Sequence, residues 1–245
     1  MVENNEHAIK TPIIESIYPE FCNLAGDYGN IMYLKTCITE ATYVETNYLD
    51  TPYFAQHDVD FIYMGNMTEF QQELALSKLM PLRDRIRELM DAGVPMLFTG
   101  SAAELLGNYI ERDGRKIEAL GLIDFYTRDM APERYCDVFM GYTKDEEEIV
   151  GFKAQFSQVM GDNQQNYFCR VHNGFGNNKD AAYEGYRINN CIATWVIGPL
   201  LPLNPLLVEQ LIARLGTGEL AYAEESYTAH NHHVEQFLNK DFSLL

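Results

Sequence analysis

The sequence is poor in basic residues: 18 lysines and arginines stand against 36 aspartates and glutamates in 245 residues. The formal net charge of -18 repels the phosphate backbone of nucleic acids and the anionic headgroups of membranes. No run of about 18 apolar residues, which a membrane-spanning helix needs, occurs in the chain. Residues 1–10 are polar and lack the apolar centre of a signal peptide. We therefore expect a cytoplasmic protein that binds neither nucleic acid nor membrane.

Closely spaced cysteine pairs and phosphate-binding loops are also missing. The five cysteines are odd in number, widely spaced and mostly surrounded by apolar residues, which indicates reduced, buried thiols in a cytosolic protein. Neither G-x-x-x-x-G-K-[ST] nor G-x-G-x-x-G occurs, so no loop for nucleotide phosphates is recognisable. We expect no cofactor, and we assign any ATP-dependent step to another polypeptide.

What the sequence does contain is enough apolar material for a sizeable core, with 47% hydrophobic residues. As far as Gly100, strand-like runs alternate with segments of helical periodicity, which is typical of an open, mostly parallel sheet with helices on both faces. A first helix has an apolar stripe from Ile31, and a second is capped by Thr68, kinked at Pro81 and ended by Gly93. The strands predicted around them are 15–25, 42–47, 60–64 and 94–99.

The second half of the chain favours antiparallel structure added to this α/β sheet. A hairpin-like turn is predicted at 113–116, and an amphipathic helix begins at Pro205. Because no repeat or Pro/Ser-rich linker divides the chain, we predict a single domain over 13–245, preceded by a polar tail at 1–12. The predicted antiparallel or edge strands are 120–126, 135–142, 149–156, 167–171 and a pair around 189–190.

The strand at 94–99 turns sharply at Gly100 into a predicted helix over 102–110. In α/β folds such a corner lies at the carboxyl edge of the sheet, where free helix N–H groups and nucleophiles are commonly found. Gly100 itself brings no reactive side chain. Ser101 and Glu104 have the S-x-x-E spacing of a capping box, so we expect Ser101 to cap the helix.

Several short motifs then identify a family by their order along the chain. They are Gly-Asp-Tyr-Gly-Asn at 26–30, Leu-Leu-Gly at 105–107, Leu-Gly-Leu-Ile-Asp at 120–124, Gly-Phe at 151–152, Gly-Phe-Gly-Asn-Asn at 174–178, Glu-Gly at 184–185 and Gly-Pro-Leu-Leu-Pro-Leu-Asn-Pro at 198–205. Together they resemble the class I glutamine amidotransferase domain of the cobyric acid synthase type, from about Ile17 to about Leu215. Within it the chain is most similar to the glutaminase subunits of lipid II isoglutaminyl synthases. The resemblance implies a flavodoxin-like fold and a protein that hands ammonia to a synthetase.

The residues that carry the family's chemistry are replaced in this chain. The resemblance implies a cysteine nucleophile at the elbow and a histidine base before the last helix, and Gly100 and Ile197 stand at those positions. Met-Gly-Asn-Met at 64–67 replaces a glycine run of the oxyanion site, and Lys-Ala-Gln at 153–155 replaces Glu-Asn-His. We therefore expect no catalytic residue, and a ligand cleft formed by Gly65, Asn66, Gly100, Ser101, Gln155 and Ile197.

Three functions stay open, and we favour the first. In that one the chain is a silent amidotransferase-like subunit or binding protein, which docks a partner such as a Mur-ligase-like or other ATP-dependent synthetase subunit, or holds a small molecule in the cleft. The second is an active glutamine amidotransferase or other hydrolase with relocated residues, and the third is unrelated chemistry in the same cleft. Ser101 lacks the glycines of a G-x-S-x-G elbow, while packing and core roles are expected for Thr99 and Cys191.

The remaining polar residues of interest are favoured to be structural. His230, His232 and His233 lie near the C terminus, where His232 and Glu235 share one helical face. We expect a solvated helix there and no metal site. His172 should lie at a strand end or turn without a catalytic role. The motif at 26–30 should shape the first strand-to-helix turn, with contact to a partner or ligand as the alternative.

Overall fold

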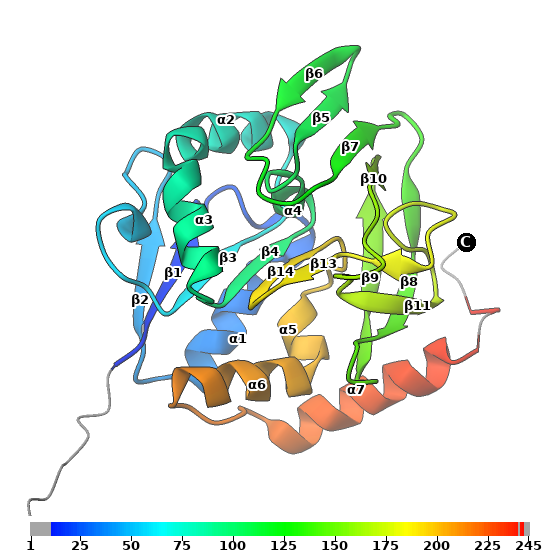
Figure 1. The fold of residues 1–245 in the computed structure, drawn as a ribbon. Helices are drawn as coiled ribbons and strands as arrows, with labels where there is room; N and C mark the ends of the chain where they lie inside the picture. Colours follow the sequence, from blue (N-terminus) through cyan, green and yellow to red (C-terminus); the bar gives the residue numbers. More distant parts are fainter. Residues whose placement is uncertain (1–10, 240, 243–245) are drawn as a thin grey trace, which may run out of the picture.

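The computed structural model describes residues 11–239 and 241–242, so the predicted tail at 1–12 lies outside it except for Thr11 and Pro12. A six-stranded sheet forms the centre of the molecule, in the order β13-β14-β4-β3-β1-β2 (Figure 1). All neighbouring strands in it are parallel except β13, which pairs antiparallel with β14. The predicted α/β fold with a mostly parallel sheet is therefore confirmed. The strands are β1 (Ile13–Ile17), β2 (Thr42–Thr46), β3 (Phe61–Met64), β4 (Met96–Thr99), β13 (Tyr186–Ile188) and β14 (Cys191–Thr194).

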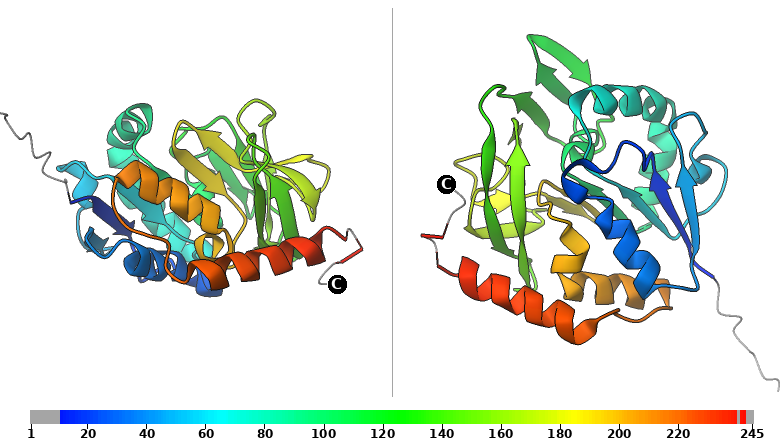
Figure 2. Two further views of the ribbon diagram at one scale, coloured as in Figure 1. Left: turned by 90° about the horizontal axis from the view of Figure 1, so that it is seen from below. Right: turned by 180° about the vertical axis from the view of Figure 1, so that it is seen from behind.

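Helices cover both faces of this main sheet (Figure 2). Ile62 and Met96 pack with α2 and α3 on one face, and Phe61 and Leu97 pack with α1, α5 and α6 on the other. None of the helices in the described part of the chain combines the length and apolarity needed to cross a membrane. The helices are α1 (Gly29–Cys37), α2 (Glu69–Leu79), α3 (Arg83–Asp91), α4 (Ser101–Glu104), α5 (Leu200–Leu203), α6 (Pro205–Leu215) and α7 (Ala223–Phe237), with short 3-10 turns η1 (Leu24–Gly26), η2 (Tyr53–Ala55) and η3 (Met80–Leu82).

Two four-stranded sheets stand beside the main sheet, in the orders β10-β7-β5-β6 and β12-β11-β8-β9 (Figure 1). They contain the other strands predicted for the second half, whereas the strand pair predicted around 189–190 forms β13 and β14 and gives the main sheet an antiparallel edge, as expected. A bridge between Phe152 and Ile197 joins β9 to the segment after β14. The strands are β5 (Tyr109–Arg112), β6 (Arg115–Glu118), β7 (Tyr126–Asp129), β8 (Tyr135–Tyr142), β9 (Glu148–Gln155), β10 (Ser157–Met160), β11 (Cys169–Asn173) and β12 (Tyr183–Glu184).

Local signals in the sequence set several boundaries correctly. Thr68 and Gln71 form a reciprocal capping box at the start of α2. Pro81 lies in η3 and separates α2 from α3, because a proline cannot donate to the preceding turn. Gly93 has a φ of +78°, which closes α3 before β4. The predicted hairpin turn at 113–116 joins β5 to β6.

The predicted helix over 102–110 is wrong, because α4 ends at Glu104 and β5 begins at Tyr109. The capping box predicted for it is also wrong. Gly100 occupies the N-cap position, and the Ser101 hydroxyl donates to the carbonyl oxygen of Met67 at 2.7 Å. Glu104 is buried and accepts hydrogen bonds from β7 and β10. Both side chains of the S-x-x-E pattern therefore bind residues outside the helix.

Three predicted strand boundaries are also corrected by the structure. β1 ends at Ile17 and not at Ala25, because Tyr18 adopts a φ of +51° and starts a turn. The predicted strand at 120–126 begins only at Tyr126, since the backbone from Leu120 onward hydrogen-bonds to the carbonyl groups that follow α4. The strand predicted at 167–171 forms two residues later, as β11.

Candidate functional site

The corner after β4 has the backbone shape of a nucleophile elbow. Gly100 has φ of +58° and ψ of -131°, a conformation that glycine adopts without strain and that costs other residues about 1–3 kcal/mol. Its N–H donates to the carbonyl oxygen of Thr194 on β14 at 2.8 Å. The chain is thereby held in the sharp strand-to-helix turn at which α/β hydrolases carry their nucleophile.

A buried network around Asp27 fixes this elbow from below. The Asp27 carboxylate accepts hydrogen bonds from the Thr99 hydroxyl, from the Asn66 N–H at 2.7 Å and from the Tyr63 hydroxyl at 3.0 Å. Asn30 donates to its other oxygen at 2.9 Å. Burial raises the pKa of Asp27, and these donors oppose that rise. The motif at 26–30 therefore shapes the first turn, as expected, and also ties it to the ends of β3 and β4.

The side chain of Asn66 occupies the space in front of the elbow. A Cβ atom placed on Gly100 would lie 2.3 Å from Asn66 Oδ1 and 2.7 Å from Asn66 Cβ, closer than real contacts allow. Asn66 Oδ1 also accepts the hydrogen bond of the Ser101 N–H at 3.0 Å. In nucleophile elbows that N–H, on the residue after the nucleophile, stabilises the oxyanion. Asn66 thus fills the place of a nucleophile side chain and takes up the oxyanion donor.

The second N–H near the elbow is engaged as well. The Met67 N–H donates to Ser101 Oγ at 2.9 Å, while the same hydroxyl donates back to the Met67 carbonyl oxygen. The Asn66 N–H donates its hydrogen bond to the Asp27 carboxylate, as described above. The N–H groups of Asn66, Met67 and Thr68 in the loop after β3 therefore all have partners from within the chain.

Five of the six predicted cleft residues line one pocket of about 590 Å³, which we call the elbow pocket. Gly65 does not line it, because a Cβ at that position would press on Tyr63 and Asp27 in the buried network behind. The residues come from the main sheet and from both smaller sheets. The lining residues are Asn66, Gly100, Ser101, Gln155 and Ile197, together with Leu24, Met67, Glu69, Glu104, Arg112, Asp129, Arg134, Ala154, Phe156, Ser157 and Trp195.

Ile197 stands at the position expected for the base, and its hydrocarbon side chain has no group that transfers a proton. It is 4% exposed, and its N–H donates to the Phe152 carbonyl oxygen at 2.8 Å. Cys191 is buried at the opposite, amino end of the sheet, where it pairs in register with Met96. Burial raises the pKa of the Cys191 thiol to about 12, so it is not a displaced nucleophile.

The charged residues of the elbow pocket were not identified from the sequence. Glu104 accepts from the Ser157 hydroxyl at 2.6 Å and from the Thr127 hydroxyl at 3.0 Å, and burial raises its pKa. Arg112 Nε donates a hydrogen bond to Asp129 Oδ2, on the neighbouring strand β7, at 3.1 Å. The sequence signal for Glu104 was its place three positions after Ser101. The capping-box pattern assigned its side chain to the start of the helix, whereas it binds Ser157 and Thr127.

Three polar groups that line the pocket lack partners. Gln155 Oε1 and Trp195 Nε1 are buried without a hydrogen-bond partner in the described residues. The Arg134 side chain faces the Phe156 ring, 5.8 Å from its centroid, and has no carboxylate partner among the same residues. Buried polar groups are nearly always paired in folded proteins. Gln155 Oε1 and Trp195 Nε1 are thus available to a small polar molecule, while Arg134 is exposed and adds a positive charge to the lining.

Lys153, two residues before Gln155, is held in the protein core. Its Nζ donates to the Gly176 carbonyl oxygen at 2.7 Å and lies 3.6 Å from Glu184 Oε1. Burial lowers the pKa of Lys153 to about 8, because desolvation outweighs the attraction of Glu184. This departure from the family motif therefore creates a buried ion pair beside the pocket and supplies no group to it.

The C-terminal histidines lie on α7, which packs on α5, α6 and the second small sheet. His230 Nδ1 contacts the Leu203 carbonyl oxygen at 2.8 Å and His233 Nδ1 that of Ala229 at 2.8 Å, while His232 is exposed. Within the described ranges, no three His, Cys, Asp or Glu side chains are grouped so as to hold a metal. His172 lies near the end of β11, as expected, with Nε2 3.4 Å from the Leu238 carbonyl oxygen.

Comparison with known proteins agrees with the resemblance seen in the sequence. The profile of the CobB/CobQ-like glutamine amidotransferase domain matches residues 14–204. The lipid II isoglutaminyl synthase (glutamine-hydrolyzing) subunit GatD of Staphylococcus aureus (strain N315) is 29% identical over 199 residues, 78% of this chain and 79% of that protein. GatD of Streptococcus pneumoniae (strain ATCC BAA-255 / R6) is 26% identical over 204 residues, which cover 81% of this chain and 78% of that protein. A crystal structure of a glutamine amidotransferase shares the fold, with a TM-score of 0.56 at 11% identity over 83% of this chain and 99% of that one.

Proposed function

Because this chain belongs to the CobB/CobQ-like glutamine amidotransferase domain family, we propose that it is an amidotransferase-like subunit or binding protein that does not hydrolyse glutamine. Hydrolysis by the covalent route needs a nucleophile at the elbow, a base beside it and free N–H groups for the oxyanion. Gly100 and Ile197 supply neither of the first two. The observation that carries the proposal is the Asn66 side chain, which fills the nucleophile's place and binds the Ser101 N–H.

The neighbouring hydroxyls and thiols do not support a relocated active site. Ser101 Oγ is hydrogen-bonded to the N–H and to the carbonyl oxygen of Met67, and no histidine or carboxylate of the described residues hydrogen-bonds to it. Thr99 donates to Asp27, and Cys191 lies at the far end of the sheet. Loss of a nucleophile and its base usually removes many orders of magnitude of rate, so a residual reaction through these side chains is not expected.

We infer a role in a complex from the relatives and from what this chain lacks. The similar proteins are named as subunits of lipid II isoglutaminyl synthase. This chain has no phosphate-binding loop, so an ATP-dependent step would belong to a partner, such as a Mur-ligase-like synthetase subunit. The unpaired polar groups of the elbow pocket support a small molecule as a second kind of ligand. The five free cysteines agree with action in the cytoplasm.

A glutaminase assay tests the proposed loss of activity. We expect no glutamate from the purified protein, and no adduct with a glutamine analogue that carries an electrophile in place of the amide. Gly100→Cys alone should also stay inert, because Asn66 still occupies the site. The triple variant Gly100→Cys, Asn66→Gly, Ile197→His should form the adduct. Glutamate release by the unaltered protein, abolished by replacing a single pocket residue, would overturn the proposal.

Co-expression with candidate synthetase subunits tests the complex. A chain with a net charge of -18 should favour a partner with a basic face, and the attraction between charges reaches only roughly 8 Å at physiological ionic strength. Size-exclusion chromatography at low salt should show a joint peak that weakens as salt is raised. A protein that elutes alone with every candidate at both salt concentrations would contradict this part of the proposal.

A further inference from the structure

A second pocket, of about 500 Å³, lies at the amino end of β4, and we call it the α6 pocket. It shares no lining residue with the elbow pocket. Side chains from the main sheet, such as Leu97 and Ile192, form one wall, and Leu207 and Leu211 of α6 form the other. Neither the proposed loss of glutaminase activity nor the partner depends on it.

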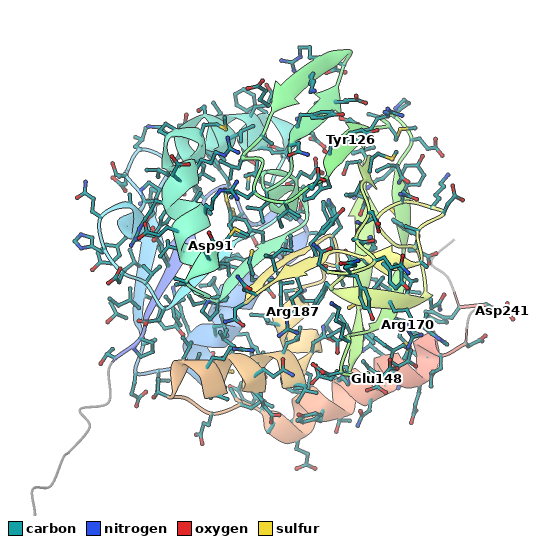
Figure 3. All side chains as sticks on the ribbon, in the orientation of Figure 1. Asp91, Tyr126, Glu148, Arg170, Arg187 and Asp241 are labelled. Atoms are coloured by element: carbon teal, nitrogen blue, oxygen red, sulfur yellow. The ribbon has the colours of Figure 1, made fainter. Side chains whose placement is uncertain are left out.

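The walls of the α6 pocket are apolar and its charges are all positive. Most of its lining residues are Leu, Ile, Met, Phe or Pro, and no aspartate or glutamate is among them. The two charged lining residues are Arg187 on β13 and Arg214 on α6. Figure 3 shows Arg187 in the region between the β13 hairpin and α6. In a chain with twice as many acidic as basic residues, a lining of this kind selects for a negative ligand.

In the part of the chain that the structure describes, neither guanidinium group has a side-chain hydrogen bond or an ion pair. Arg187 is half-buried and Arg214 is exposed. Five other arginines bind carboxylates, and two bind the Gly121 carbonyl oxygen. The eighth is Arg134, which lines the elbow pocket. Arginine is suited to binding a carboxylate through two parallel hydrogen bonds.

We propose that the α6 pocket binds a small apolar monocarboxylate, such as a medium-chain fatty acid. The hydrocarbon chain lies between α6 and the face of the main sheet, where it is removed from water. The carboxylate lies at Arg187 and Arg214, whose guanidinium groups donate charge-assisted hydrogen bonds to it. A free phosphate lacks the apolar part, and a neutral alcohol or an amine lacks the negative group, so the arrangement favours the carboxylate over each of them.

Titration calorimetry with octanoate, 1-octanol and octylammonium at equal concentrations tests this proposal. We expect octanoate to bind one-to-one, octanol to bind at least about tenfold more weakly, and octylammonium not to bind. Each methylene added to the chain, as from octanoate towards decanoate, should tighten binding roughly fourfold until the pocket is full. Arg187→Gln with Arg214→Gln should reduce octanoate to the affinity of octanol. The matched control Arg170→Gln, on a surface arginine paired with Glu146, should leave the affinity unchanged.

Methyl NMR of the unaltered protein locates the ligand without any variant. Octanoate should shift the methyl signals of Leu207 and Leu211 and leave that of Leu24, which lines the elbow pocket, in place. No octanoate binding, equal affinity for octanoate and octanol, or shifts at Leu24 in place of the α6 leucines would each overturn the proposal. The glutaminase assay is independent of all three results, so the two proposals fail separately.

Discussion

Two polar regions meet at the elbow, and they differ in how their groups are hydrogen-bonded. Below the elbow, the Asp27 carboxylate accepts hydrogen bonds from α1, from β3 and the loop after it, and from β4, and all of the donor residues are buried. In front of it, Gln155 Oε1 and Trp195 Nε1 remain without partners in the described chain. We propose that the first region serves as scaffold and the second as a binding surface. The elbow has its sharp backbone turn although glycine stands at position 100.

The largest expected effect comes from removing the centre of the scaffold. Asp27→Ala leaves the Thr99 hydroxyl and the Asn66 N–H buried without an acceptor, while Tyr63 keeps its bond to the carbonyl oxygen of residue 27. This should cost about 3–5 kcal/mol of unfolding free energy. Urea denaturation followed by circular dichroism measures it. Asp91→Ala, at an exposed position labelled in Figure 3, is the control and should change stability by no more than about 0.5 kcal/mol. A loss as small as the control's would refute the distinction between scaffold and pocket.

A smaller effect is expected where the two regions touch. Gly100→Ala should cost about 2–3 kcal/mol, because the new Cβ meets Asn66 and the residue has a φ of +58°. In an Asn66→Gly background the contact is gone and the cost should fall by about 1 kcal/mol. A double-mutant cycle of unfolding free energies gives this coupling. If the two substitutions are strictly additive, Asn66 does not fill the nucleophile's place.

The smallest expected effect is a change of stability with pH at Glu104. Burial raises its folded-state pKa above the ordinary 4.5, so the folded protein keeps this proton after the unfolded chain has lost it. The contribution of Glu104 is therefore complete below about pH 4.5 and is lost as the pH rises through the raised pKa. Glu104→Gln should be within about 1 kcal/mol of the parent at low pH and should gain on it as the pH rises. A difference that does not vary with pH would contradict this.

The Lys153 and Glu184 pair shows the limit of motif reading in the same region. The sequence marks Lys153 as a departure beside the cleft, and the structure places it in the core with its charge opposed by Glu184. Nothing in the sequence links residues 153 and 184, because the contact arises from the pairing of β8, β9, β11 and β12. Motif departures near a site can thus serve packing and electrostatics in place of chemistry.

The parallel sheet and the sharp turn at Gly100 could be predicted from the sequence, as could the presence of glycine and isoleucine at the positions where the family resemblance implies a nucleophile and a base. These follow from local properties: hydrophobic periodicity, the cap at Thr68, the break at Pro81 and the identity of single residues. Three features could be seen only in the folded chain: Asn66 fills the elbow, Ser101 and Glu104 bind outside their helix, and unpaired arginines line the α6 pocket. Such facts depend on contacts between residues distant in the chain, such as Asn66 and Ser101, whose geometry arises only when the strands are packed.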